Sequence, residues 1–159
     1  DARDPRQPVQ MTTDAARMEA SLVAVADAGI DIRHMLFDRF FAAFPDRRAS
    51  FMVVDASSRR MTDETLQMMF GLAKGEGWVW PLVAELVFTH RAYGPLPIGE
   101  YDAFIDMTVV ELGVAAGAAW NTEVEAAWQC HADALKAMIR RARVEWENAM
   151  PVGTPQPAD

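Results

Sequence analysis

The chain has 159 residues, of which 51% are hydrophobic and 24% charged, the composition of one globular domain. Asp and Glu number 23 against 15 Lys and Arg, and this net charge of -8 argues against nucleic acid as a partner. No apolar stretch is long enough to span a membrane, and the single cysteine, Cys130, excludes an internal disulfide and disfavours a cysteine-based zinc site. The N-terminal residues also lack the apolar core of a signal peptide. We therefore expect a cytoplasmic protein with no membrane partner.

Both ends of the chain are expected to form disordered tails. Residues 1–10 are polar and contain two prolines, and Met11 offers an alternative natural start. Residues 150–159 contain too much proline for a packed element. The folded domain is therefore expected over residues 11–149, a length with no room for a flavin or nicotinamide reductase.

Helical periodicity fills the chain between these tails, with little of the alternation that strands show. Thr13 or Asp14 is expected to cap the first helix and Gly29 to end it. The last helix begins with a predicted capping box, in which Thr122 is the N-cap and Glu125 reaches back. Six helices are predicted, over residues 13–28, 31–44, 58–74, 81–93, 100–116 and 122–146.

The three histidines are the side chains on which metal or acid–base chemistry would depend. His90 follows Leu86 by four residues on the apolar face of its helix, so one ring nitrogen is expected to bond the Leu86 carbonyl. The other nitrogen would then be free to bind a metal. A core histidine bonded to its own helix explains the same pattern, and both interpretations stay open. His131 and His34 also lie on apolar helix faces and are interpreted as structural.

Other catalytic motifs are missing from the sequence. It contains no HExxH or CxxC and no closely spaced group of histidines and carboxylates, so a zinc or di-iron site has weak support. Ser57 and Ser58 lack the context of a nucleophile elbow, and no glycine-rich phosphate loop follows a strand. Hydrolase and nucleotide-binding functions are therefore disfavoured.

Several segments resemble the helices of bacterial globins. Residues 37–46, FDRFFAAFPD, with Phe51 shortly after, are similar to the second globin helix and the turn that follows it. Residues 81–94, PLVAELVFTHRAYG, resemble the proximal helix, and residues 100–101 and 122–128 resemble the starts of the two closing helices. The similarity to single-domain bacterial globins and to the globin domain of flavohaemoglobins extends over residues 15–143.

This resemblance implies an all-α, globin-like fold of about six to eight packed helices around a haem cleft. It implies haem b as cofactor, His90 as the proximal iron ligand and Phe51 packed on the porphyrin, with a diatomic gas (O2, NO or CO) at the sixth position of the iron. The candidate cofactor-binding residues are Phe37, Phe51, Met61, Thr65, Leu66, Leu86, His90, Tyr93 and Tyr101.

The sequence departs from the family at the distal positions. Flavohaemoglobin-like globins place a tyrosine and a glutamine toward bound oxygen, and the matching positions here are Phe37 and Met61, with Thr65 one turn further on. Neither Phe37 nor Met61 donates a hydrogen bond. The loss of such a donor costs about 1–3 kcal/mol, which corresponds to roughly tenfold to a hundredfold weaker oxygen retention.

The sequence also departs from the family on the proximal side. Tyr101 matches a proximal tyrosine, but the position of the accompanying glutamate falls at Arg143. Glu145 is rotated from that position by about 200° on a helix and does not replace it. Peroxidase-like or dioxygenase-like activation of the haem is therefore disfavoured.

Three hypotheses stay open. The first is a gas-binding globin, in which nitric oxide dioxygenation would need a separate reductase as partner. The second is a haem-free signalling or protein-interaction module, in which methionines and aromatics fill the cleft (Met61, Met68, Met69, Phe70, Trp78 and Trp80). The third is six-coordinate haem, with Met61 or His34 as the internal ligand. A homodimer is compatible with each.

Overall fold

The protein is all-α over the residues that its computed structural model describes, which are residues 7–149 for the backbone and 13–149 for the side chains. No strand occurs in this range, which confirms the all-α part of the expected fold. The elements are α1 (Gln7–Asp27), α2 (Arg33–Ala43), η1 (Pro45–Ser50), α3 (Val54–Ala73), α4 (Val79–His90), η2 (Arg91–Tyr93), α5 (Ile98–Ala116), η3 (Gly117–Ala119) and α6 (Thr122–Ala149), where η marks a short 3-10 helix.

The first helix begins earlier than the sequence predicts. It starts at Gln7, so the predicted cap at Thr13 or Asp14 is wrong and both residues lie inside α1. Pro8 explains the difference, because a proline in the first turn gives up an N–H that has no helical partner there. Residues 7–10 of the expected N-terminal tail are thus helical, while residues 1–6 and 150–159 lie outside the described range.

Most other helix ends agree with the glycines and prolines of the sequence, with two further corrections. The third helix begins at Val54, four residues before the predicted start at 58, so residues 54–57 are helical and not part of a loop. Gly29 has a φ of 66° just after α1, a left-handed conformation that favours glycine. Pro81 lies in the first turn of α4. The cap of α6 is Asn121 rather than Thr122, because the Val124 amide donates to Asn121 Oδ1 over 2.9 Å. Asparagine caps at least as well as threonine, so the helix begins one residue sooner and the predicted capping box does not form.

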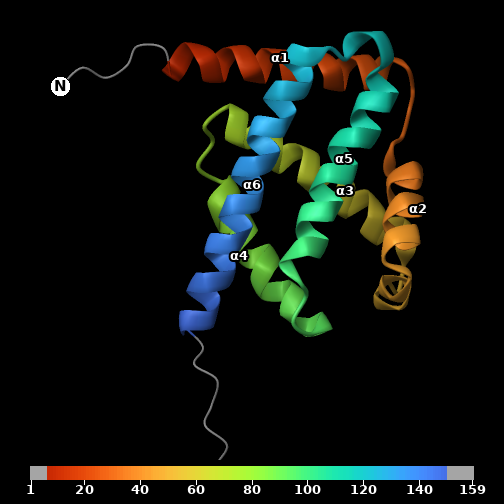
Figure 1. Ribbon diagram of the computed structural model, residues 1–159, viewed down its shortest axis with the longest axis vertical. Coiled ribbons are helices and arrows are strands. Elements are labelled where there is room, and N and C mark those ends of the chain that lie inside the picture. Colours follow the sequence, from red (N-terminus) through yellow and green to blue (C-terminus); the bar gives the residue numbers. More distant parts are fainter. Residues whose placement is uncertain (1–6, 150–159) are drawn as a thin grey trace, which may run out of the picture.

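The helices pack in two layers with α1 across one end. In Figure 1, α5 and α6 run side by side over α3 and α4, and α1 crosses the end where α5 finishes and α6 starts. The fully buried Trp128 joins α6 to α1, since its indole N–H donates to Ser21 Oγ over 2.9 Å. None of the described helices has the length and apolar character that a membrane crossing requires.

Two apolar clusters form the interior. The larger one joins side chains of α1, α3, α4, α5 and α6, and the smaller one packs the aromatic rings of α2 against Phe104 of α5. Phe37 lies at the centre of the smaller cluster, in edge-to-face contact with Phe40, Phe51 and Phe104 at ring-centroid distances of 5.5–6.1 Å. These ring contacts hold α2 against the side of α5.

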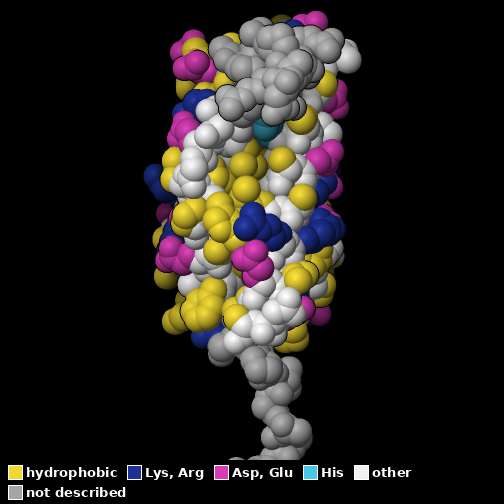
Figure 2. Space-filling model, turned by 90° about the vertical axis from the view of Figure 1, so that its left-hand side faces the viewer, with side chains coloured by type: hydrophobic (Ala, Val, Ile, Leu, Met, Phe, Trp, Pro, Cys, Tyr) yellow, Lys and Arg dark blue, Asp and Glu magenta, His cyan; other side chains and the backbone are white. Residues whose placement is uncertain are grey.

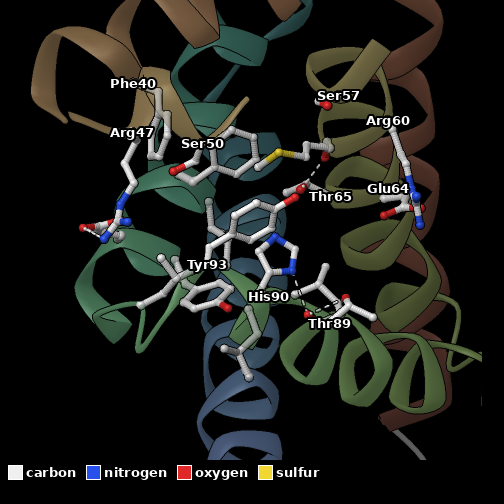
Figure 3. Close-up of a pocket in the computed structure, with 18 of the residues that line it drawn as sticks. Phe40, Arg47, Ser50, Ser57, Arg60, Glu64, Thr65, Thr89, His90 and Tyr93 are labelled. Carbon is white, nitrogen blue, oxygen red and sulfur yellow. Dashed lines mark hydrogen bonds and ion pairs between the residues drawn. The ribbon is translucent and has the colours of Figure 1, made fainter. Parts of the chain in front are cut away.

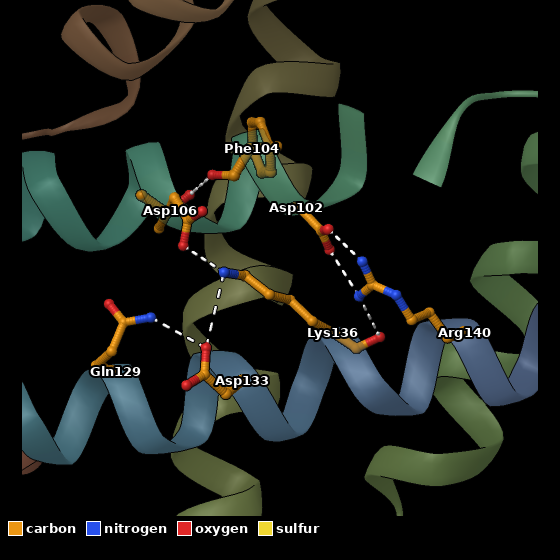
Figure 4. Close-up of polar contacts among 8 residues, drawn as sticks. Asp102, Phe104, Asp106, Gln129, Asp133, Lys136 and Arg140 are labelled. Atoms are coloured by element: carbon orange, nitrogen blue, oxygen red, sulfur yellow. Dashed lines mark hydrogen bonds and ion pairs between the residues drawn. The ribbon is translucent and has the colours of Figure 1, made fainter. Parts of the chain in front are cut away.

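Ion pairs connect the exposed sides of α5 and α6. Figure 4 shows Lys136 of α6 between Asp106 of α5 and Asp133 of its own helix, and Arg140 of α6 against Asp102 of α5. The face in Figure 2 carries hydrophobic side chains interspersed with charges of both signs. Solvent screens the ion pairs between α5 and α6. We therefore expect these pairs to affect the alignment of the two helices more than the free energy of unfolding.

Candidate functional site

A pocket of about 450 Å³ opens where the two apolar clusters meet. Its volume lies within the roughly 300–1,000 Å³ of typical ligand pockets. Side chains of all five helices from α2 to α6 contribute to it, as do η1 and η2. The apolar part of its wall comes from Phe40, Phe51, Met52, Met61, Met68, Leu82, Leu86, Ala92, Leu96, Phe104, Ile105, Leu135 and Ile139.

His90 reaches into this pocket from the last residue of α4. Its Nδ1 lies 2.7 Å from the carbonyl oxygen of Leu86, one turn earlier, which confirms the contact expected from the sequence. This bond assigns the proton to Nδ1 and leaves the lone pair of Nε2 available to a metal. In Figure 3 the ring projects toward the middle of the pocket, with Thr65 and Phe40 on the opposite side.

The wall opposite His90 offers little hydrogen bonding. The Thr65 hydroxyl donates to the carbonyl oxygen of Met61 over 2.7 Å, so its proton is already used within α3. Met61, Phe40 and Phe51 complete this side of the pocket and carry no N–H or O–H group on their side chains. The two polar residues nearest to this wall, Ser50 and Ser57, lie toward the rim (Figure 3).

The structure brings together seven of the nine residues that the sequence assigned to the site. These are Phe51, Met61, Thr65, Leu86, His90, Tyr93 and Tyr101. Phe37 and Leu66 do not line the pocket. Phe37 is 3% exposed and stands behind the wall formed by Phe51 and Phe104, while Leu66 packs against the larger cluster.

Charged side chains surround the mouth of the pocket. Arg47 of η1 donates two hydrogen bonds to Glu100 of α5, over 2.6 and 3.0 Å, and these bonds raise the pKa of its guanidinium. Arg60 and Glu64 form a second pair on α3 at 3.0 Å. Glu85 also lines the pocket, so its charged lining consists of two guanidinium groups and three carboxylates, and both guanidinium groups are engaged in ion pairs.

Tyr101 and Arg143 lie together on the His90 side. The Tyr101 ring centroid is 5.9 Å from that of His90. Burial raises the pKa of the Tyr101 phenol, and the nearby guanidinium of Arg143 opposes this shift. Arg143 also donates to the Leu96 carbonyl over 2.6 Å. Arg143, at the position where the resemblance would place a glutamate, thus lies beside Tyr101 and brings a cation there.

The other two histidines do not reach the pocket. His131 is buried, and its Nδ1 lies 2.8 Å from the Ala127 carbonyl oxygen, in agreement with a structural role for that nitrogen. His34 is exposed and contacts Arg33 at 3.2 Å, so it does not share the buried face of Phe37. Of the six residues proposed to fill the cleft, Met61 and Met68 line it, while Met69, Phe70, Trp78 and Trp80 do not.

Sequence reasoning missed several lining residues. Phe40 and Phe104 face the pocket from α2 and α5, and Arg47 and Arg60 stand at its mouth. Phe40 lies one turn after Phe37, so the helical spacing contained a usable signal, but the arginines lie in polar segments without a distinguishing pattern.

Comparisons with known protein families, with curated proteins and with solved structures gave no match. The chemistry of the pocket therefore rests on its own residues. It combines one imidazole nitrogen with a free lone pair, an apolar interior and ion pairs at the mouth. An apolar interior of this kind favours an apolar ligand over a polar substrate.

Proposed function

We propose that this pocket binds haem b, with His90 as the axial ligand of the iron, and that the protein is a globin-like binder of a diatomic gas. The observation that carries the proposal is the position of His90, whose Nδ1 is bonded to Leu86 and whose Nε2 faces an apolar pocket of about 450 Å³. A hydrogen-bonded Nδ1 is the usual support of a metal-binding imidazole. The helix order and the resemblance to bacterial globins are consistent with the proposal.

The residues present fit this cofactor. Phe51, Leu86 and Phe104 supply apolar walls for the faces of a porphyrin, and Ile105, Leu135 and Ile139 close the inner end of the pocket. Arg47 and Arg60 are the cations of the lining that would pair with carboxylates of the cofactor, in competition with the neighbouring glutamates. The two hydrogen bonds to Glu100 use Nε and one terminal nitrogen of the Arg47 guanidinium. Arg47 would then share this group between Glu100 and the cofactor.

The chemistry that haem iron supplies when bound is the reversible coordination of O2, NO or CO at its sixth position. The chain contributes an apolar wall opposite His90 and keeps the imidazole proton on Nδ1, which donates it to the Leu86 carbonyl, away from the iron. Because the Thr65 hydroxyl is bonded to the Met61 carbonyl, neither Thr65 nor the side chains of Met61 and Phe51 offer a free donor to a polar ligand. We therefore propose that CO and NO are held better than O2.

We propose ligand binding, without turnover, as the activity of the chain alone. The largest charge effect on Tyr101 comes from Arg143, a cation, so the phenol has no strong anionic partner with which to act on His90. Nitric oxide dioxygenation would in addition need electrons from a separate reductase. A gas sensor or carrier needs neither.

The test is a titration of the purified protein with hemin, followed by reduction with dithionite and addition of CO, with absorption spectra at each step. We expect one hemin per chain, a high-spin reduced spectrum and a sharp Soret band that shifts on CO binding. A low-spin reduced spectrum before CO would indicate an internal sixth ligand, for which Met61 is the lining candidate. A folded, helical protein that takes up no hemin would contradict the proposal and favour the haem-free interaction module.

A further inference from the structure

Three metal-binding side chains meet at the other end of the molecule from the mouth of the pocket, between α1 and α6. Asp14 belongs to α1, and Cys130 and His131 are neighbours on α6. One ligand atom from each residue lies within 4.8 Å of those of the other two. No sequence pattern predicts this group, because Asp14 is separated from the other two residues by most of the chain.

We propose that Asp14, Cys130 and His131 form a binding site for a divalent transition metal of the zinc type. The site lies outside the haem pocket, none of whose lining residues it uses, and the proposal does not depend on haem. A carboxylate oxygen, a thiolate sulfur and an imidazole nitrogen are the three donor types that Zn²⁺ accepts. Three protein ligands would leave the fourth tetrahedral position to water.

His131 provides the observation that points to a ligand. The residue is only 7% exposed, and its Nδ1 is bonded to the Ala127 carbonyl oxygen at 2.8 Å. No hydrogen bond joins its Nε2 to another described residue, so this nitrogen is available beside a carboxylate and a thiol. Nδ1 bonded to a backbone carbonyl fixes the tautomer that a metal-binding histidine needs.

The geometry requires only small movements. Three atoms no more than 4.8 Å apart lie within about 2.8 Å of a common centre, against zinc–ligand lengths of about 2.0–2.3 Å. Rotation of the short Asp14 and Cys130 side chains is enough to close this difference. Cys130 is exposed, so an ion has access from solvent, while His131 forms the buried floor.

The surrounding charges permit this arrangement. The Asp14 carboxylate is 14% exposed, and among the described side chains it has one long ion-pair contact of 3.7 Å, with Arg17. Arg17 also contacts Glu123 at 3.4 Å, and Glu123 can keep this partner when Asp14 turns to a metal. On binding, the Cys130 thiol forms a sulfur–metal bond and releases its proton to the buffer.

The experiment measures Zn²⁺ binding to the full chain by isothermal titration calorimetry, in parallel for the parent protein, Cys130→Ala and Asp14→Asn. Asp133→Asn is the matched control, because it removes an exposed carboxylate of α6 that lies outside the cluster. We expect one Zn²⁺ per chain, at least tenfold weaker binding in both cluster variants, and unchanged affinity in the control. Thermal melting of each variant checks that it is folded.

X-ray absorption at the zinc edge of the parent protein provides a second, independent measurement. One sulfur at about 2.3 Å, with nitrogen and oxygen at about 2.0–2.2 Å, is the expected shell. A shell without sulfur, the lack of stoichiometric binding, or an unchanged affinity in either cluster variant would overturn the proposal. Hemin uptake is recorded on the same samples and is expected to be equal in all of them, so the two proposals fail or succeed separately.

Discussion

His90 is the single side chain on which cofactor binding should depend most strongly. Replacement by alanine removes the nitrogen whose lone pair faces the pocket, while the pocket walls remain. We expect His90→Ala to lose stable hemin retention on gel filtration, with a broadened Soret band. His34→Ala is the matched control, because His34 is exposed and does not line the pocket, and it should retain one hemin per chain.

Imidazole in solution separates loss of the ligand from loss of the fold. In a folded His90→Ala protein, the space left by the ring should accept free imidazole and recover a sharp Soret band. Normal hemin stoichiometry in His90→Ala without added imidazole would assign the iron ligand to another residue.

Met61 is the position at which a hydrogen-bond donor is most easily introduced. It lines the pocket opposite His90 and is half-buried, and glutamine has nearly the same shape. We expect Met61→Gln to slow O2 dissociation roughly tenfold or more, because a new N–H donor is worth about 1–3 kcal/mol to a polar ligand in a dry site. CO dissociation should change much less. Stopped-flow kinetics of the ferrous protein measures both rates.

Met61→Leu keeps the apolar character and provides the control for this substitution. Equal O2 dissociation rates in Met61→Gln and Met61→Leu would show that position 61 does not reach the ligand. The register of α3 toward the haem iron would then differ from the one proposed.

For single residues, the sequence predicted contacts within a helix correctly, but it did not predict which aromatic rings line the pocket. The bond from His90 to Leu86 follows from four-residue helical spacing alone. The choice between Phe37 and Phe40 does not, because both rings lie on the same broad face of α2. Which ring lines the pocket depends on how α2 is rotated against α5, and the contacts with Phe104 determine that rotation.

The ends of the helices are set by single side chains, and α6 offers a direct test. The Asn121 side chain accepts a hydrogen bond from the Val124 amide, whereas Thr122 is exposed at the first helical position. We expect Asn121→Ala to lower the free energy of unfolding by about 1 kcal/mol, within the range found for lost N-caps. Urea denaturation followed by circular dichroism measures the change.

Thr122→Ala is the matched control for the cap. It shortens a neighbouring polar side chain without removing the bond to Val124, so the change in stability should be smaller than half of that in Asn121→Ala. The opposite order would restore Thr122 as the cap and the capping box with Glu125.

Helix positions could be predicted from periodicity, and their exact ends only partly. The apolar spacing identified all six α-helices, and glycine or proline marked most of the breaks. The start of α1 was missed because a proline in a first turn is as compatible with a helix as with a tail. Adjacent candidates such as Asn121 and Thr122 differ too little in capping preference for the sequence to separate them.

At the scale of the whole molecule, two apolar clusters leave a pocket at their junction. The sequence pattern predicts which face of each helix is apolar. It does not predict the distance between the two clusters, because that distance depends on how all the helices pack. The group of Asp14, Cys130 and His131 was invisible for the same reason, since α1 meets α6 only in the folded chain. The resemblance to globins predicts a cleft beside His90, and His90 lines the pocket, but the resemblance predicts nothing about this second group.

A ligand that fills the junction should stabilise the entire fold. The pocket exists only in the folded state, so hemin binding adds about 4 kcal/mol to the free energy of unfolding when free hemin exceeds its Kd a thousandfold. For a domain of this size, that gain corresponds to an increase in Tm of about 8–16 °C. Differential scanning calorimetry with increasing hemin measures it, with His90→Ala as the protein in which the increase should be much smaller.

The helices in which hemin slows amide hydrogen exchange distinguish a cofactor bound in the pocket from hemin adsorbed on the surface. The walls of the pocket come chiefly from α3 and α4, whereas α1 and the first half of α6 pack on the far side around Trp128. Amide hydrogen exchange should therefore slow most in α3 and α4 at hemin concentrations below those that protect α1, because local opening of the pocket walls needs less free energy than global unfolding. Equal protection of every helix would mean that the pocket already opens only with the whole molecule, and protection confined to exposed segments would identify adsorption.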